Sequence, residues 1–84
     1  MATTSMLTEA AKIVKVRREG YGSPETNFQN IATMWSVIFN IDVSPRQVAQ
    51  AMIALKLCRD INKADYDNML DIAGYADCGV EVDK

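Results

Sequence analysis

Two Ser-Pro pairs, each followed by apolar residues at helical spacing, restrict this chain most strongly to helical folds. Ser23 and Ser44 are suited to cap a helix, because a serine hydroxyl accepts a hydrogen bond from a free N–H group of the first turn. Pro24 and Pro45 fit the first helical position, where the missing N–H of proline removes no hydrogen bond. The sequence therefore predicts helices that begin at residues 24 and 45.

The apolar residues that follow recur every three or four positions, as expected for helices with one buried face. We expect four helices, at residues 6–18, 24–39, 45–58 and 63–76, with Gly20 ending the first and a tail at 77–84. The run VAQAMIALKLC is apolar almost all round, so the third helix is predicted to be central or to lie at an interface. The other inward faces are predicted to hold Leu7, Ala10, Ala11 and Val14; Phe28, Ile31, Ala32, Trp35, Ile38 and Phe39; and Tyr66, Met69, Leu70 and Ala73.

The length of 84 residues indicates one domain with a small core, although 49% of the residues are hydrophobic. We therefore expect a compact, all-α, four-helix domain that is completed by homo-oligomerisation, which covers apolar surface that a small core cannot bury. No apolar run is long enough to span a membrane, so no membrane association is expected.

Charge and residue types exclude several classes of function. The net charge of −2 argues against binding to duplex nucleic acid, and the absence of histidine removes His-based zinc sites and serine triads. Cys58 and Cys78 are far apart and no signal peptide is expected, which indicates free thiols and a cytoplasmic location.

Basic residues gather at two places where an anion could bind. Lys12, Lys15, Arg17 and Arg18 form one cluster, and Lys56 and Arg59 stand at the end of the third helix. On a helical wheel, Arg59 continues the apolar line of that helix and Lys56 lies at its edge. These cations could cover apolar surface, pair with acids such as Asp67 or Asp71, or bind an anionic ligand.

Two other features could carry chemistry. Asp67 and Asp71 are one helical turn apart and could share a magnesium ion, or they could pair with basic residues of a neighbouring helix. In REGYGSPE, Gly20 and Gly22 leave room around Tyr21, whose ring could stack on a base, beside a helix start that offers N–H groups to an anion. The loop could equally be an ordinary connection between helices.

Three blocks of the chain, REGYGSPETNFQNIATMWS, SPRQVAQAMIALKLCR and DNMLDIAGYADCGVE, resemble in order those of a small phage- and prophage-encoded helical family of unknown function. The resemblance covers roughly residues 7–81. That family is distantly similar to the MazG-like all-α nucleotide pyrophosphohydrolases, whose Glu-x-x-Glu and Glu-x-x-Asp motifs hold magnesium against nucleotide phosphates. The resemblance implies a MazG-like fold in which Asp71, with Asn68 or Asp67, occupies the second motif; Gln50 and Ala54 stand where the first motif requires acids.

With half of those carboxylates missing and cations nearby, we expect a non-catalytic, cofactor-free binder of a small nucleotide, such as a sponge for nucleotide immune signals. In this hypothesis Tyr21 stacks on the base, Arg18, Lys56 and Arg59 contact phosphates, and Asn27 and Asp71 contact the sugar or base. The full predicted site is Arg17, Arg18, Tyr21, Gly22, Asn27, Lys56, Arg59 and Asp71. The alternatives are a weak magnesium-dependent pyrophosphohydrolase that uses Asp67 and Asp71, with Glu25 as a further candidate, and a module that binds a host protein through the third helix.

Overall fold

The computed structural model describes residues 5–82, except for the side chain of Tyr21, and this part of the chain forms four α-helices. They are α1 (Met6–Tyr21), α2 (Pro24–Phe39), α3 (Pro45–Asn62) and α4 (Tyr66–Glu81). No strand occurs between residues 5 and 82, so the predicted all-α, four-helix class is confirmed.

The two predicted helix starts at Ser-Pro are capped as expected. The Ser23 hydroxyl accepts a hydrogen bond from the Thr26 N–H at 3.3 Å. Ser44 accepts one from the Gln47 N–H at 3.1 Å, and the Gln47 side chain accepts one from the Ser44 N–H at 2.8 Å. This reciprocal pair satisfies two N–H groups that would otherwise lack partners at the start of α3.

The ends of three helices differ from the prediction. Gly20 does not end α1, which continues to Tyr21; Gly22 follows with a φ of 91° and donates its N–H to the Arg18 carbonyl at 3.0 Å. Only glycine adopts this backbone conformation without strain, so the second glycine of the pair, and not the first, ends the helix. α3 extends to Asn62, four residues beyond the predicted end.

α4 begins at Tyr66, three residues later than predicted, and continues to Glu81, so most of the expected tail is helical. Its start is set by Asp65, whose side chain accepts a hydrogen bond from the Asp67 N–H at 2.9 Å. The helix passes through Gly79, where an added Cβ would lie 3.3 Å from the Ala49 Cβ. The close contact with α3 thus outweighs the low helix propensity of glycine.

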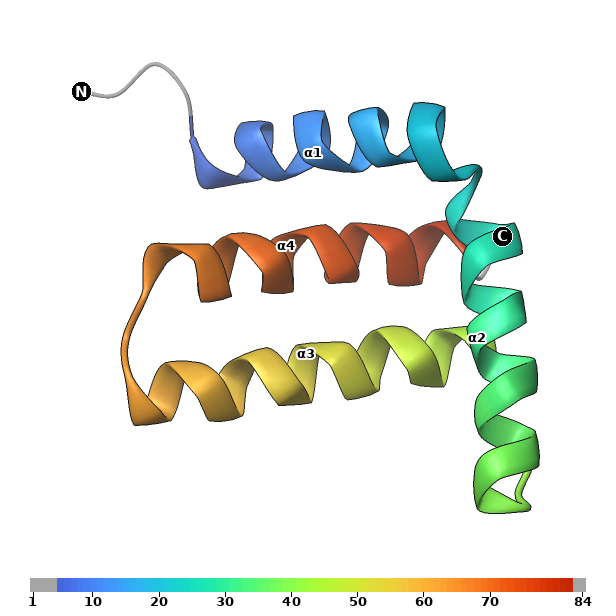
Figure 1. The fold of residues 1–84 in the computed structure, drawn as a ribbon. Coiled ribbons are helices and arrows are strands. Elements are labelled where there is room, and N and C mark those ends of the chain that lie inside the picture. The colour runs from blue at the N-terminus through green and yellow to red at the C-terminus, as the bar shows by residue number, and fades with distance from the viewer. Residues whose placement is uncertain (1–4, 83–84) are drawn as a thin grey trace.

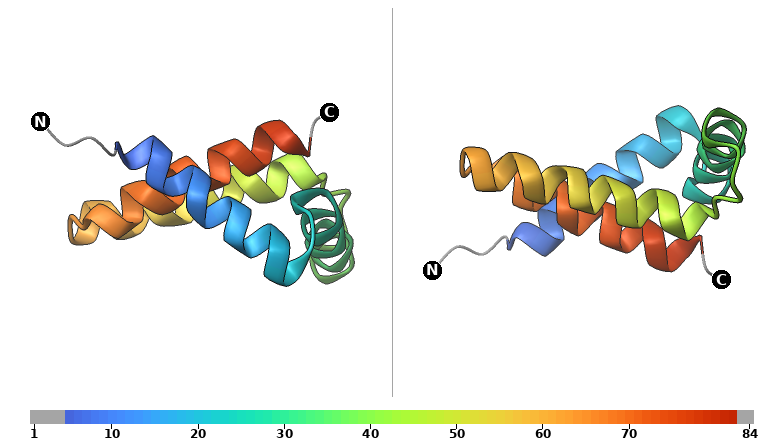
Figure 2. Two further views of the ribbon diagram at one scale, coloured as in Figure 1. Left: turned by 90° about the horizontal axis from the view of Figure 1, so that it is seen from above. Right: turned by 90° about the horizontal axis from the view of Figure 1, so that it is seen from below.

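Three of the helices follow one another in space in the order α1, α4, α3, and α2 runs in a different direction from them (Figure 1). α4 lies between α1 and α3, and it packs against both of them. α3 and α4 run side by side, whereas α1 crosses α4 obliquely (Figure 2). α2 begins next to the end of α1, runs across the ends of α4 and α3, and packs mainly against α3.

The core lies where α2, α3 and α4 meet. Phe28, Ala32, Val48 and Ala49 are buried there, and Ile31, Trp35 and Tyr75 pack against them while remaining partly exposed. Ser36 closes the turn between α2 and α3: its hydroxyl accepts a hydrogen bond from the Val43 N–H at 2.9 Å.

Several residues predicted to face inward are exposed instead. They include Leu7, Ala11, Ile38, Phe39, Tyr66 and Met69. Ile38 and Phe39 lie on the half of α2 that projects beyond the other helices (Figure 1). Tyr66 is held at the surface, where its hydroxyl donates a hydrogen bond to the Glu9 carboxylate at 2.6 Å. α3 is not the central helix, because α4 lies between α1 and α3, and only Val48 and Ala49 on α3 are buried.

Candidate functional site

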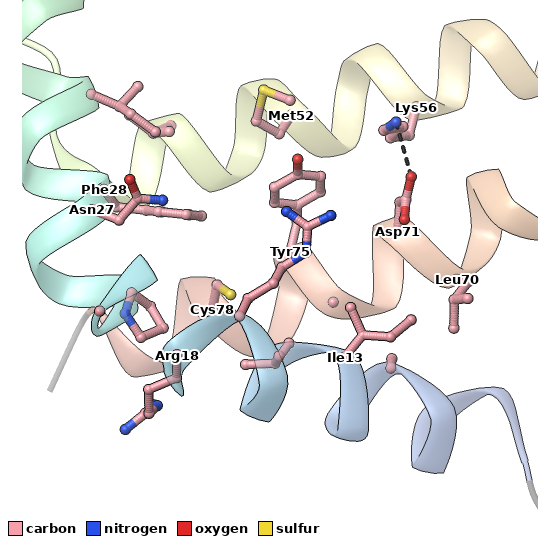
Figure 3. A pocket seen from close by; sticks show the side chains of 18 residues that line it. Ile13, Arg18, Asn27, Phe28, Met52, Lys56, Leu70, Asp71, Tyr75 and Cys78 are labelled. Atoms are coloured by element: carbon pink, nitrogen blue, oxygen red, sulfur yellow. Dashed lines mark ion pairs between the residues drawn. The ribbon is translucent and has the colours of Figure 1, made fainter. Parts of the chain in front are cut away.

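A cavity of about 400 Å³ lies between the helices and is lined by all four of them. Each helix contributes residues at spacings of three or four, so the cavity is bordered by one face of each helix. Figure 3 shows side chains from α2, α3 and α4 converging on this space.

α4 provides the floor of the cavity. Asp71, Gly74, Tyr75 and Cys78 are spaced i, i+3, i+4 and i+7, and all four line the cavity. Gly74 keeps the floor open, because it has no side chain and a Cβ added there would meet only Val14, at 3.8 Å. The floor therefore combines a carboxylate, an open strip, an aromatic ring and a thiol.

The last two turns of α1 supply two cations. The Arg18 guanidinium donates a hydrogen bond to the Glu81 carboxylate at 2.9 Å, and this hydrogen bond raises the pKa of Arg18. Arg17 also lines the cavity, but it forms no hydrogen bond or ion pair with any other residue in the range 5–82. Arg17 is thus the cation whose charge is available to a ligand.

A third cation, Lys56, reaches the cavity from α3. Its ammonium group lies 2.9 Å from the Asp71 carboxylate, which is the ion pair drawn in Figure 3. Lys56 is the more enclosed partner, with 15% of its side chain exposed against 39% for Asp71. Pairing with a neighbouring helix is one of the alternatives that the sequence left open for both residues.

Two aromatic rings border the same space. The centroids of Phe28 and Tyr75 are 6.4 Å apart, and their planes are tilted by 40°. Phe28 is buried at the α2 side of the cavity, whereas Tyr75 is partly exposed (Figure 3). An apolar wall with a few polar groups is typical of small-molecule sites, whose volumes are commonly about 300–1,000 Å³.

The Cys78 thiol lies near the arginines. Burial raises the pKa of Cys78, and the Asp77 carboxylate adds to that rise, whereas Arg18 and Arg17 oppose it. Because the thiolate is the reactive form, the raised pKa makes Cys78 less reactive at neutral pH than an ordinary thiol.

Six of the eight predicted ligand-binding residues border the cavity: Arg17, Arg18, Gly22, Asn27, Lys56 and Asp71. Arg59 does not, and it is exposed. The reason is the position along α3: Arg59 lies on the same helical face as Val48 and Met52, but one turn beyond Lys56 towards the C-terminal end of the helix, past the residues that line the cavity. The Tyr21 side chain lies outside the described part of the structure.

The residues of the magnesium hypothesis do not all border the cavity. Asp71 lines the cavity, but Asp67 is exposed in the first turn of α4, and neither Asp67 nor Glu25 lines the cavity. Among residues 5–82, no group of three or more Cys, Asp or Glu residues is arranged to hold a metal ion.

Sequence reasoning missed Tyr75 and Cys78 as cavity residues. A signal for both was present, since they lie four and seven positions after Asp71 on the same helical face. Phe28 was predicted to be a core residue, and it both fills the core and borders the cavity.

Comparison with known proteins places this chain among phage proteins. It matches the family described as Domain of unknown function (DUF6378) over residues 5–83. The chain belongs to this family. The predicted membership in a phage-encoded family of unknown function is thereby confirmed. Every residue that lines the cavity lies within the region shared with the family.

Two curated relatives are proteins of mycobacterial phages. The Gene 55 protein of Mycobacterium phage L5 is 39% identical over 75 residues, which cover 86% of this chain and 48% of the relative. The Gene 55 protein of Mycobacterium phage D29 is 36% identical over 77 residues, which cover 88% of this chain and 50% of the relative. The chain thus spans about half the length of these relatives. No solved structure matches the chain, and none of the helices described between residues 5 and 82 is long and apolar enough to cross a bilayer.

Proposed function

We propose that the chain binds a small nucleotide in the cavity and does not hydrolyse it. The observation that carries this proposal is the charge of the lining. Three cations, Arg17, Arg18 and Lys56, border the described cavity; Lys56 is paired with Asp71 and Arg18 with Glu81, which leaves the positive charge of Arg17 uncompensated in a chain whose net charge is −2. Such a local surplus favours an anionic ligand.

The three cations differ in whether they already have an ion-pair partner. Lys56 is paired with Asp71, and Arg18 with Glu81. Arg17 has no such partner among residues 5–82, so it can offer a bidentate, charge-assisted contact to a phosphate without first breaking an ion pair. Arg17 is therefore the residue on which phosphate binding should depend most.

The rest of the lining suits a ligand with a flat ring. Phe28, Tyr75 and Met52 provide apolar surface in the same cavity, against which a base can pack. Asn27 can donate or accept hydrogen bonds at base or sugar edges, and the Asp71 carboxylate can accept them. We choose a nucleotide among anions of this size because of the resemblance of the chain to MazG-like nucleotide pyrophosphohydrolases.

The arrangement of Asp71 favours binding over metal-dependent hydrolysis. A magnesium ion at this carboxylate would have to displace the Lys56 ammonium, which lies 2.9 Å away, and it would be repelled by Arg17. No second carboxylate borders the described cavity to compensate. In phage-encoded members, binding without turnover would sequester a host nucleotide signal.

The thiols provide a direct test of cavity occupancy. We expect a bound nucleotide to slow alkylation of Cys78, which lines the cavity, and to leave alkylation of the exposed Cys58 unchanged. The measurement is site-resolved mass spectrometry with iodoacetamide, using a panel of mononucleotides, dinucleotides and cyclic nucleotides in the presence of a chelator. Equal rates at Cys78 with every nucleotide would rule out the proposal, and protection that requires added magnesium would favour the hydrolase.

A charge-matched pair of variants tests the role of Arg17. Arg17→Gln should weaken binding of the protecting nucleotide about 10- to 100-fold, as expected for loss of a charge-assisted hydrogen bond worth about 1.5–3 kcal/mol. Lys15→Gln removes the same charge from an exposed position of α1 outside the cavity lining. Isothermal titration calorimetry should show nearly unchanged affinity for that control; equal losses in both variants would mean that only the overall charge matters.

A further inference from the structure

The outer half of α2 carries a surface that the four helices leave uncovered. Five large apolar residues, each more than half exposed, make up this α2 surface: Met34, Val37, Ile38, Phe39 and Ile41. Val37, at 73%, is the most exposed of them. Contiguous apolar surface of this kind on a small domain typically marks an interaction site.

The α2 surface is electrically neutral. No charged residue occurs at positions 26–41, so the whole length of α2 after Glu25 lacks ionic side chains. The five side chains of the α2 surface therefore add no like-charge repulsion to contact with a copy of the same surface, although the Asp42 carboxylate lies beside them. A surface for an anionic membrane usually carries basic residues at its margin, whereas acids, Glu25 and Asp42, flank this segment.

A groove lies directly beside these residues. It has a volume of about 570 Å³ and is lined by Trp35, Ile38, Phe39, Val43 and Ala51, among others. The same helix thus presents protruding side chains, such as Met34 and Val37, next to a concave apolar site. In a two-fold interface each copy supplies both parts, because residue i of one copy contacts residue j of the other and the reverse.

We propose that a second copy of this chain covers the α2 surface, with the two α2 helices packed against each other around a two-fold axis. The small core provides a further reason. Six hydrophobic residues are buried within the range 5–82, and the α2 surface alone exposes five large ones. Burying them would add apolar contact that the isolated domain lacks. This inference does not depend on the ligand of the cavity.

The test compares glutamate substitutions at two exposed valines. Val37→Glu places two like charges in the interface, one from each copy, and should raise the dissociation constant of the dimer at least tenfold. Val16→Glu changes an equally exposed valine on α1 and should leave the dimer intact. Sedimentation equilibrium gives the dissociation constants, and circular dichroism verifies that both variants keep the helical content of the natural chain.

A cross-linking experiment places the axis independently. In a Cys58→Ser background, a cysteine introduced in place of Val37 should form an intermolecular disulfide faster than one introduced in place of Val16. A chain that stays monomeric at the highest attainable concentration would overturn the proposal. So would a dimer that Val16→Glu weakens and Val37→Glu leaves unchanged, since a different surface would then form the interface.

Discussion

The two halves of α2 carry the same apolar pattern, but most apolar residues of the inner half are buried and most of those of the outer half are exposed. In the inner half, residues 24–32, Phe28 is 5% exposed and Ala32 is fully buried. In the outer half, residues 33–39, Ile38 and Phe39 are each more than 60% exposed although they continue the same stripe. α2 begins next to the end of α1 and runs past the ends of α4 and α3, so these two helices lie beside the inner half and the outer half projects past them (Figure 1).

This difference shows what hydrophobic periodicity can and cannot indicate. The period of the pattern identifies which face of a helix is apolar, because that follows from 3.6 residues per turn. It contains no information on how much of that face a neighbouring helix covers. The coverage depends on the crossing angle between helices, which is a property of the whole fold.

The largest effect that follows from this comparison is on stability. Phe28→Ala should lower the free energy of unfolding by about 3–5 kcal/mol, the range for truncation of a buried aromatic side chain. Phe39→Ala, on the same helix, should cost less than about 0.5 kcal/mol for the isolated chain, as is usual at exposed positions. Urea denaturation at low protein concentration, where any dimer is dissociated, measures both values.

Similar losses in the two variants would contradict the view of α2 as half covered. A loss for Phe39→Ala that appears only at high protein concentration would instead be the signature of an interface between copies, since association stabilises the fold by mass action.

The helix starts were predictable because their causes are local. The caps at Ser23 and Ser44 depend on residues within three positions, so the sequence alone contains the whole interaction. The ends of α1 and α4 were predicted less well. At Gly79, contact with Ala49 of α3 keeps the chain helical, and that contact is between residues far apart in the sequence.

The same distinction applies to the site. Most of its charged residues could be predicted because the charges stand at the edges of apolar helical faces, which is where a cavity between helices receives them. That Arg59 lies beyond the cavity could not be predicted, because a helical wheel shows which face of α3 a residue occupies and not its position along the helix axis. The partner of Arg18, Glu81, could not be predicted, since the sequence assigned that residue to a tail and not to a helix.

A second prediction compares two glycines of α4, one that borders the cavity and one that is packed closely against α3. Gly74→Ala should stabilise the fold by up to about 1 kcal/mol, because alanine has the higher helix propensity and its Cβ meets only Val14, at 3.8 Å. Gly79→Ala gains the same propensity, but its Cβ would lie 3.3 Å from that of Ala49. Because neither Cβ can rotate away, overpacking of about 1–3 kcal/mol should make this variant less stable than the natural chain.

Thermal and urea denaturation of the two glycine variants measure these changes in stability. Equal stabilisation by both substitutions would mean that α3 and α4 can shift to accommodate the methyl group added at Gly79. Gly74→Ala should also weaken nucleotide binding, because the new methyl group occupies the floor of the cavity; unchanged affinity would place the ligand elsewhere.

The smallest expected effect concerns the pH dependence of stability at the cavity wall. Because burial raises the pKa of Cys78 above its ordinary value of 9.0, the fold favours the neutral thiol over the thiolate. The resulting contribution to stability is fully present below pH 9.0 and is lost as the pH rises through the raised value.

Unfolding free energies measured by urea denaturation from neutral to alkaline pH should therefore fall more steeply for the natural chain than for Cys78→Ser, whose hydroxyl does not titrate. Cys58→Ser, at an exposed position, is the matched control and should retain the steep fall, because that variant keeps Cys78. Identical profiles for all three chains would mean that the Cys78 thiolate remains well solvated at the cavity wall, and the cavity would then be more open to water than its apolar lining indicates.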